Sequence, residues 1–222
     1  MILYLITTLL SVIIVYILIV RPLLIYWGAT TEEIYAALPG DEYISSPEIN
    51  TTKAVLVNAK PAEIWPWIVQ MGQGRGGHYS YDWLENLFGF QMNSVLEILP
   101  EMQHLKAGDT VNFSAGRKMV ADKIAHEKYV LLLEHDDQQK KSEKTSHPLA
   151  SWLIYLQLLE NGDTHVISHI RYAYRPGILY FLKMRLFIEL AGFIMERRML
   201  LGIKERAEYV KNMLSRVPHL SR

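Results

Sequence analysis

Residues able to do chemistry gather in one stretch of the chain, from Trp65 to Gly89. Aromatic and aliphatic residues recur at helical spacing on both sides of a glycine-rich segment, so the stretch predicts two short helices joined by a sharp bend. The bend carries Gln73 and Arg75, and His78 follows it directly. The pattern indicates one wall of a hollow in which polar side chains lie among aromatic rings.

We expect Gln73, Arg75 and His78 to orient the polar head of a small ligand in this hollow. Arginine can hold a carboxylate or a phosphate through two parallel hydrogen bonds. In the alternative interpretation Arg75 pairs with Asp82 or Glu85, the bend is only a structural elbow and the rings around it are plain core. In the first interpretation the apolar body of the ligand contacts five aromatic residues, which are Trp65, Trp67, Tyr79, Tyr81 and Trp83.

Asp82, His78 and Tyr81 are the candidate catalytic residues, because a carboxylate, an imidazole and a phenol can serve as acid and base in a cyclase-like or hydrolase-like reaction. Such a role requires a carboxyl group whose pKa is raised in a dry pocket. No serine nucleophile motif or carboxylate pair stands out in the sequence. The glycines follow a predicted helix and no Gly-Lys-Ser/Thr is present, so a phosphate-binding loop is not predicted. We therefore favour ligand binding over catalysis.

A metal site is not expected. His165 and His169 share one face of a predicted strand with Arg171, but the spacing supplies no obvious third ligand. A partly exposed sheet face is the more ordinary explanation of these residues. No cofactor motif is found, and none is expected.

Composition excludes several classes of protein. Lys+Arg and Asp+Glu number 23 each among 222 residues, so the formal net charge is zero and binding to nucleic acid is disfavoured. The chain has no cysteine, which excludes a disulfide framework and a thiolate nucleophile. The length suits one globular domain with an apolar segment at one end.

That apolar segment runs from Ile2 to Val20 without a charge. As a helix it extends about 28 Å, close to the thickness of the bilayer core. A signal peptide is the alternative, but the segment lacks a cationic start and a small-residue cleavage site. We expect a single-pass membrane anchor over residues 1–27. Arg21 flanks it and favours a cytoplasmic location for the rest of the chain.

The rest of the chain alternates between turn signals and two kinds of periodicity. Residues 28–50 predict a short helix opened by a capping box at Thr30, then a linker or strap. A glycine turn at Asn161-Gly162-Asp163 predicts a hairpin, and 136–148 reads as an exposed loop. A long helix is expected from Ile178 to about Leu214. The predicted strands are Thr51 to Asn58, Thr110 to Phe113, Lys118 to Ile124, Tyr129 to Glu134, Ser151 to Glu160 and Thr164 to Tyr174.

This order predicts an α+β fold in which an antiparallel sheet wraps a long C-terminal helix. Several motifs carry a further indication. They are Trp27-Gly28-Ala29-Thr30, Leu38-Pro39-Gly40-Asp41-Glu42, Trp65-Pro66-Trp67, Gln70-Met71-Gly72-Gln73-Gly74-Arg75-Gly76-Gly77, Tyr79-Ser80-Tyr81-Asp82-Trp83-Leu84-Glu85-Asn86 and Met195-Glu196-Arg197-Arg198-Met199-Leu200. Through these motifs, over roughly residues 21–210, the chain resembles the SRPBCC superfamily (START-like, Bet v 1-like and polyketide cyclase-like proteins), and within it bacterial members with an N-terminal hydrophobic segment.

The resemblance implies a helix-grip domain over residues 51–216 with a cavity for a hydrophobic ligand between the sheet and the long helix. The function we expect is a membrane-anchored binding module for an apolar or amphipathic small molecule, such as a lipid or an isoprenoid. The alternatives are an enzyme that uses the same cavity and an interaction module whose hollow is filled by its own side chains.

Overall fold

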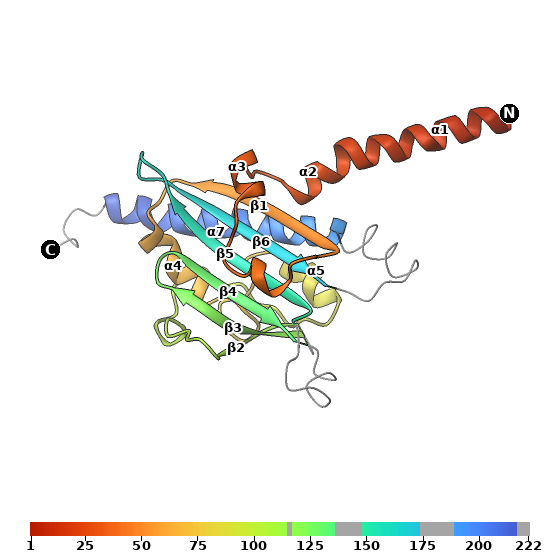
Figure 1. Ribbon diagram of the computed structural model, residues 1–222. Helices are drawn as coiled ribbons and strands as arrows, with labels where there is room; N and C mark the ends of the chain where they lie inside the picture. Colours follow the sequence, from red (N-terminus) through yellow and green to blue (C-terminus); the bar gives the residue numbers. More distant parts are fainter. Residues whose placement is uncertain (115–116, 136–147, 174–188, 217–222) are drawn as a thin grey trace.

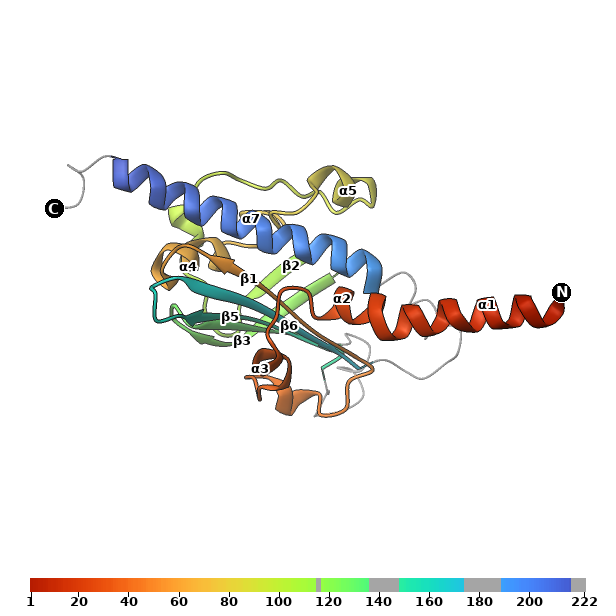
Figure 2. The ribbon, with the colours of Figure 1, turned by 90° about the horizontal axis from the view of Figure 1, so that it is seen from above.

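The structure is a computed structural model that describes residues 1–114, 117–135, 148–173 and 189–216. The loop expected over 136–148 and the first part of the expected long helix, before residue 189, therefore lie almost wholly outside the described residues. Elsewhere the chain forms one sheet with helices on one side and an N-terminal strap on the other (Figures 1 and 2).

The N-terminal apolar segment is one helical rod that projects from the body of the protein (Figure 1). It consists of α1 (Ile2–Val15), a π-helical turn η1 (Tyr16–Val20) and α2 (Arg21–Ile25). Pro22 explains the π-helical turn, because its ring cannot fit against the carbonyl group four residues earlier. The 24-residue helix Ile2–Ile25 has the length and composition of a membrane span or of a signal sequence.

Residues 28–48 form the strap across the outer face of the sheet. The strap contains α3 (Thr31–Tyr35) and the 3₁₀ turn η2 (Asp41–Tyr43). Thr30 and Glu33 cap α3 reciprocally, as the sequence predicts, but the helix ends three residues before the expected Leu38. Leu38 and Tyr43 cover a small outer core built on Leu131, Leu133 and Leu153.

The sheet has six antiparallel strands in the order β1-β6-β5-β4-β3-β2. Successive side chains of each strand point to opposite faces, and both faces are largely buried, because one packs on the helices and the other on the strap. The strands are β1 (Ile49–Val57), β2 (Thr110–Ser114), β3 (Arg117–Ala125), β4 (Tyr129–Glu134), β5 (Ala150–Leu158) and β6 (Thr164–Tyr172).

In the described parts of the chain, three helices cover the inner face. They are α4 (Pro61–Val69), α5 (Asp82–Leu87) and the long α7 (Glu189–Arg216). A 3₁₀ turn, η3 (Pro100–Met102), lies between α5 and β2 in the chain. Figure 2 shows α5 and α7 on one side of the sheet and α3 on the other. Trp67, Met199 and Ile203 lie in the main core between α4, α7 and the sheet. The prediction of an α+β helix-grip fold is confirmed.

The sequence also predicts that Ser80 caps the second short helix and that the charges of residues 195–200 face water. The structure contradicts the prediction for Ser80 and that for Glu196. Ser80 does not cap α5, because its hydroxyl donates to the Met195 carbonyl oxygen on α7 (3.0 Å) and Tyr81 occupies the cap position. Glu196 was expected to face water with the other charges of its segment, but it is 8 % exposed. Both side chains bind groups that are distant in the sequence, and local periodicity carries no information on such partners.

Candidate functional site

The predicted bend is a closed glycine loop between α4 and α5. Gly72 and Gly77 exchange two backbone hydrogen bonds (3.0 and 3.1 Å), and the Gln73 amide donates to the Asn112 carbonyl oxygen of β2 (2.7 Å). Gly77 has φ +82°, and a Cβ atom there would lie 2.6 Å from the Cα of Ser94. This loop, called here the elbow (residues 72–77), therefore requires glycine where it passes the chain at Ser94.

The polar residues of the elbow bind backbone carbonyl groups. The Gln73 side-chain amide donates to Phe90 O (2.8 Å). Arg75 Nη2 donates to Val69 O (2.8 Å) and Met102 O (3.1 Å), and burial lowers the pKa of this guanidinium. Arg75 thus joins the end of α4 to η3. Asp82 and Glu85, the alternative partners of Arg75, bind Ser94 and His78 instead.

Trp65, Trp67 and Tyr79 belong to the main core. The Trp67 and Tyr79 rings meet edge to face with centroids 6.0 Å apart, and the Tyr79 hydroxyl donates to Trp67 O (3.0 Å). Burial raises the pKa of Tyr79. Their large buried surface makes these rings part of the frame that holds α4 against the elbow.

Tyr81 and Trp83 lie apart from that core. Tyr81 is half-buried at the start of α5, close enough to Arg198 to interact electrostatically. Trp83 is 69 % exposed. The structure therefore brings together three of the five predicted aromatic residues and leaves Trp83 at the surface.

Asp82 has a structural partner. One carboxylate oxygen accepts from the backbone N–H of Ser94 and the other from its hydroxyl, both at 2.7 Å. The Tyr79 amide in turn donates to that hydroxyl oxygen (2.9 Å). Asp82 and Ser94 therefore fix the loop after α5 to the start of α5 and to the Tyr79 backbone.

His78 is paired with Glu85, a residue that the sequence did not single out as its partner. Nδ1 of His78 lies 3.0 Å from Glu85 Oε1, and the imidazole stacks on Phe113 with ring centroids 5.0 Å apart. Glu85 is 2 % exposed. His78 Nε2 and Glu85 Oε2 are buried with no hydrogen-bond partner among the described residues. A carboxylate that holds Nδ1–H leaves the Nε2 lone pair available as an acceptor or a base.

A polar network crosses the inside of the grip. Lys53 Nζ on β1 lies 2.6 Å from Glu196 Oε2 on α7, and the Ser168 hydroxyl donates to Glu196 Oε1 (2.5 Å). Trp152 Nε1 donates to the Ser168 hydroxyl oxygen (2.9 Å). Sequence reasoning missed this network. Its signal in the sequence is Lys53, a lysine within a strand that is mostly apolar or β-branched.

The inner face of the sheet is buried near α4, and some of its side chains are only half-buried at the other end. Near α4, Ile154, Leu156 and Val166 are buried. In the rows of the sheet beyond the Lys53 network, Trp152 and Ile170 are only half-buried although they point inward. Thr51 on β1 lies opposite Ile170 in the sheet. Its buried hydroxyl oxygen has no hydrogen-bond partner among the described residues. We call this region of Trp152, Ile170 and Tyr172 the mouth of the grip.

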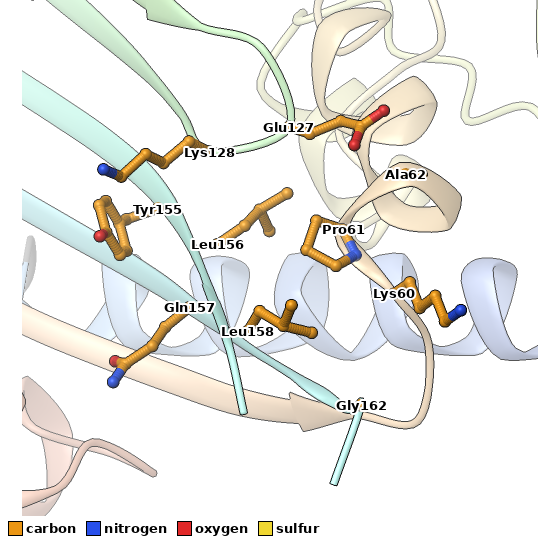
Figure 3. A pocket seen from close by; sticks show the side chains of 10 residues that line it. All are labelled: Lys60, Pro61, Ala62, Glu127, Lys128, Tyr155, Leu156, Gln157, Leu158 and Gly162. Carbon is orange, nitrogen blue, oxygen red and sulfur yellow. The ribbon is translucent and has the colours of Figure 1, made fainter. Parts of the chain in front are cut away.

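A separate groove of about 650 Å³ lies at the end of the sheet near α4, away from α1 (Figures 1 and 3). Pro61, Leu156 and Leu158 form its apolar floor, and Lys60 and Lys128 stand at its rim. This groove is not the hollow expected beneath Trp83 and Arg75.

The histidines of β6 hold the strap. His165 pairs with Glu33, and His169 bonds Thr52 through Nδ1 (2.9 Å) and Asp41 through Nε2 (3.1 Å). Arg171 Nη1 donates to the same Asp41 oxygen (2.7 Å). The predicted shared face of His165, His169 and Arg171 is thus the outer face, and the strap covers it.

No protein-family model and no curated protein matches the sequence. Among solved structures, the chain is similar to the KanY protein (16 % identity, 73 % of this chain and 99 % of that one, TM-score 0.43). It is also similar to a protein of unknown function, SA2116 from Staphylococcus aureus (13 % identity, 76 % of this chain and 99 % of that one, TM-score 0.45). A third similar structure is a point mutant of norcoclaurine synthase from Thalictrum flavum (16 % identity, 73 % of this chain and 96 % of that one, TM-score 0.42). These likenesses concern the fold alone. By its own strand order and long C-terminal helix, the chain has the α+β helix-grip arrangement that the sequence predicts.

Proposed function

We propose that the protein is a membrane-anchored module that binds an apolar or amphipathic small molecule, such as a lipid or an isoprenoid, in the mouth of the grip. The observation that carries the proposal is the position of the mouth. The half-buried side chains of Trp152, Ile170 and Tyr172 lie at the end of the sheet from which the apolar helix Ile2–Ile25 projects (Figure 1).

The anchor is joined firmly to this end. Arg21 binds Glu189, at the start of α7, through two hydrogen bonds (3.1 and 3.0 Å). Ile25 is buried, and Trp27 O accepts from the Ala54 amide of β1 (2.9 Å). A span fixed to both β1 and α7 would hold the mouth at the bilayer surface, where lipid is concentrated. Arg21 favours the cytoplasmic side.

The lining of the mouth suits an amphipathic molecule. Trp152 and Phe113 form an aromatic wall with ring centroids 5.0 Å apart, and the wall continues to His78. The Lys53–Glu196 network forms a polar base, and Ser168 of this network binds the indole N–H of Trp152. Apolar walls with a few fixed polar groups are the usual composition of small-molecule sites.

Photo-crosslinking tests the proposal. The full chain is reconstituted in phosphatidylcholine vesicles that carry a diazirine fatty acid or a diazirine isoprenoid alcohol, and cross-linked residues are identified by mass spectrometry. We expect adducts on β5 and β6 at Trp152, Ile170 or Tyr172, and we expect Ile170→Trp to remove most of them because it fills the mouth.

The matched control is Tyr129→Trp, which enlarges a half-buried side chain of the outer face. It should leave the adducts unchanged. Adducts confined to α1 and other lipid-facing residues would contradict ligand binding and favour an interaction module with a filled interior.

The pair of His78 and Glu85 favours a second candidate, an enzyme. The imidazole of His78 is oriented by the buried Glu85 carboxylate, which is the arrangement of a general base. Tyr81 and Asp82 are the other candidate catalytic groups of the same segment. If a bound ligand is identified, His78→Gln should retain its binding and abolish its conversion, measured by mass spectrometry of the extracted ligand. Identical turnover in this variant would exclude His78 as the base.

A further inference from the structure

The short helix α5 displays three large apolar side chains to solvent. Trp83, Leu87 and Phe88 are 69 %, 72 % and 68 % exposed, and we call them the α5 patch. They lie four and five residues apart, which places them on one side of the helix and its end. Leu96, in the loop that follows, is 81 % exposed. Single exposed apolar residues are ordinary, but a contiguous group of this kind marks an interaction surface.

The α5 patch cannot relieve its exposure by turning inward, because both ends of α5 are held. Asp82 binds Ser94 with both carboxylate oxygens. Asn86 exchanges two hydrogen bonds with the backbone of Met92, and Ser80 binds α7 at Met195. The opposite side of α5 carries Glu85, which is buried against His78. The helix is thus fixed with its apolar side outward.

The position of α5 indicates what covers it. In both views of the ribbon, α5 lies toward the end of the body from which α1 projects, beside the first turns of α7 (Figures 1 and 2). Those turns expose Leu190 and Ile194, which are 46 % and 41 % exposed. Arg21, at the base of the apolar helix, binds Glu189 of the same turn. Exposed apolar side chains therefore lie on α5 and on the first turns of α7, both at the end of the body from which the helix Ile2–Ile25 projects.

We propose that the α5 patch inserts into the bilayer surface beside the N-terminal span, so that the protein contacts the membrane at two separated places. The inference rests on the proposed membrane anchor. Tryptophan suits this role because its amphipathic ring prefers the interface between hydrocarbon and water. A second contact fixes the rotation of the domain about the span and keeps the mouth of the grip facing lipid.

A spin-label experiment tests the docking. The chain has no cysteine, so single variants carry one nitroxide each. Leu87→Cys is labelled in the full chain in phosphatidylcholine vesicles, and collision rates with oxygen, which concentrates in lipid, and with a water-soluble nickel chelate are measured. We expect the oxygen-to-nickel ratio at position 87 to exceed that of the control Tyr209→Cys several-fold. Tyr209 is similarly exposed, at 63 %, but lies on the part of α7 farther from the anchor.

Ser11→Cys, in the middle of the apolar helix, separates failure of the docking from failure of the anchor. A lipid signal at position 11 with an aqueous signal at 87 would overturn the docking and leave the anchor intact. An aqueous signal at both positions would overturn both. A label at 87 that collides with neither reagent would show a protein partner, such as a second copy of the chain, and would also overturn the inference.

Discussion

Lys53 on β1 and Glu196 on α7 form a buried ion pair across the inside of the grip, with 2.6 Å between Nζ and Oε2. Their side chains are 3 % and 7 % exposed. Ser168 satisfies the second carboxylate oxygen, so the charge of Glu196 has partners on two strands. The pair sets the position of α7 over the sheet just inside the mouth.

Removal of one partner should destabilise the fold strongly, because the other charge stays buried without compensation. We expect Glu196→Leu to lower the free energy of unfolding by about 3 to 5 kcal/mol, and the double variant Lys53→Met/Glu196→Leu to recover much of that loss. Urea unfolding of the full chain in detergent micelles measures both.

The exposed pair Arg198–Glu205 on the same helix is the matched control, with 2.6 Å between Nη1 and Oε1. Glu205→Gln should cost less than about 1 kcal/mol. Equal losses in Glu196→Leu and Glu205→Gln would show that the Lys53 pair is not buried in solution.

Gly202 lets α7 pass directly over the Tyr79 backbone. A Cβ atom at Gly202 would clash with the Tyr79 carbonyl oxygen, whereas one at Gly192 would meet nothing within 4 Å. We expect Gly202→Ala to lower the melting temperature and Gly192→Ala to raise it, since alanine gains about 1 kcal/mol over glycine in a helix. Circular dichroism on heating compares the two. A rise in both variants would refute the close contact between α7 and the Tyr79 backbone.

Asp41 should make the strap sensitive to acid. Burial would raise the pKa of Asp41, but the hydrogen bonds from His169 and the Leu38 amide and the charge of Arg171 lower it to about 2. Because the folded pKa is below the unfolded one, the stabilisation is full above about pH 4 and is lost as the pH falls toward 2. It amounts to about 1 kcal/mol once screening by solvent is allowed for.

Asp41→Asn should therefore destabilise the protein at pH 7 and have little effect at pH 2, as measured by urea unfolding across that range. Glu101→Gln, an exposed carboxylate-to-amide change in η3, is the control and should change neither value. A loss for Asp41→Asn that does not vary with pH would show that the charge of Asp41 does not hold the strap.

Asp82 should behave as a structural residue. Asp82→Ala removes both acceptors of Ser94, and an unmade hydrogen bond to a charged group costs about 1.5 to 3 kcal/mol. If this role is right, Ser94→Ala should cause a similar loss and the double variant should add little to either. Fully additive losses in thermal unfolding would argue that Asp82 and Ser94 do not act together.

Most of the fold follows from local sequence patterns. Alternation and turn residues predict the strands, and β4 matches its predicted bounds of Tyr129 to Glu134. The capping box at Thr30 predicts the start of α3, and the uncharged run from Ile2 predicts the N-terminal helix. These features depend on neighbours in the chain, so the sequence contains them directly.

The candidate site is different, because its contacts join residues far apart in the chain. The sequence by itself determined the helix-grip order of elements, the glycine elbow and the aromatic residues around it. Only the tertiary structure decided that Arg75 binds carbonyl groups, that Asp82 holds Ser94 and that Glu196 is buried against Lys53. Each outcome depends on which groups the packed backbone brings within hydrogen-bond distance, and periodicity along one segment carries no information on the partner that another segment supplies.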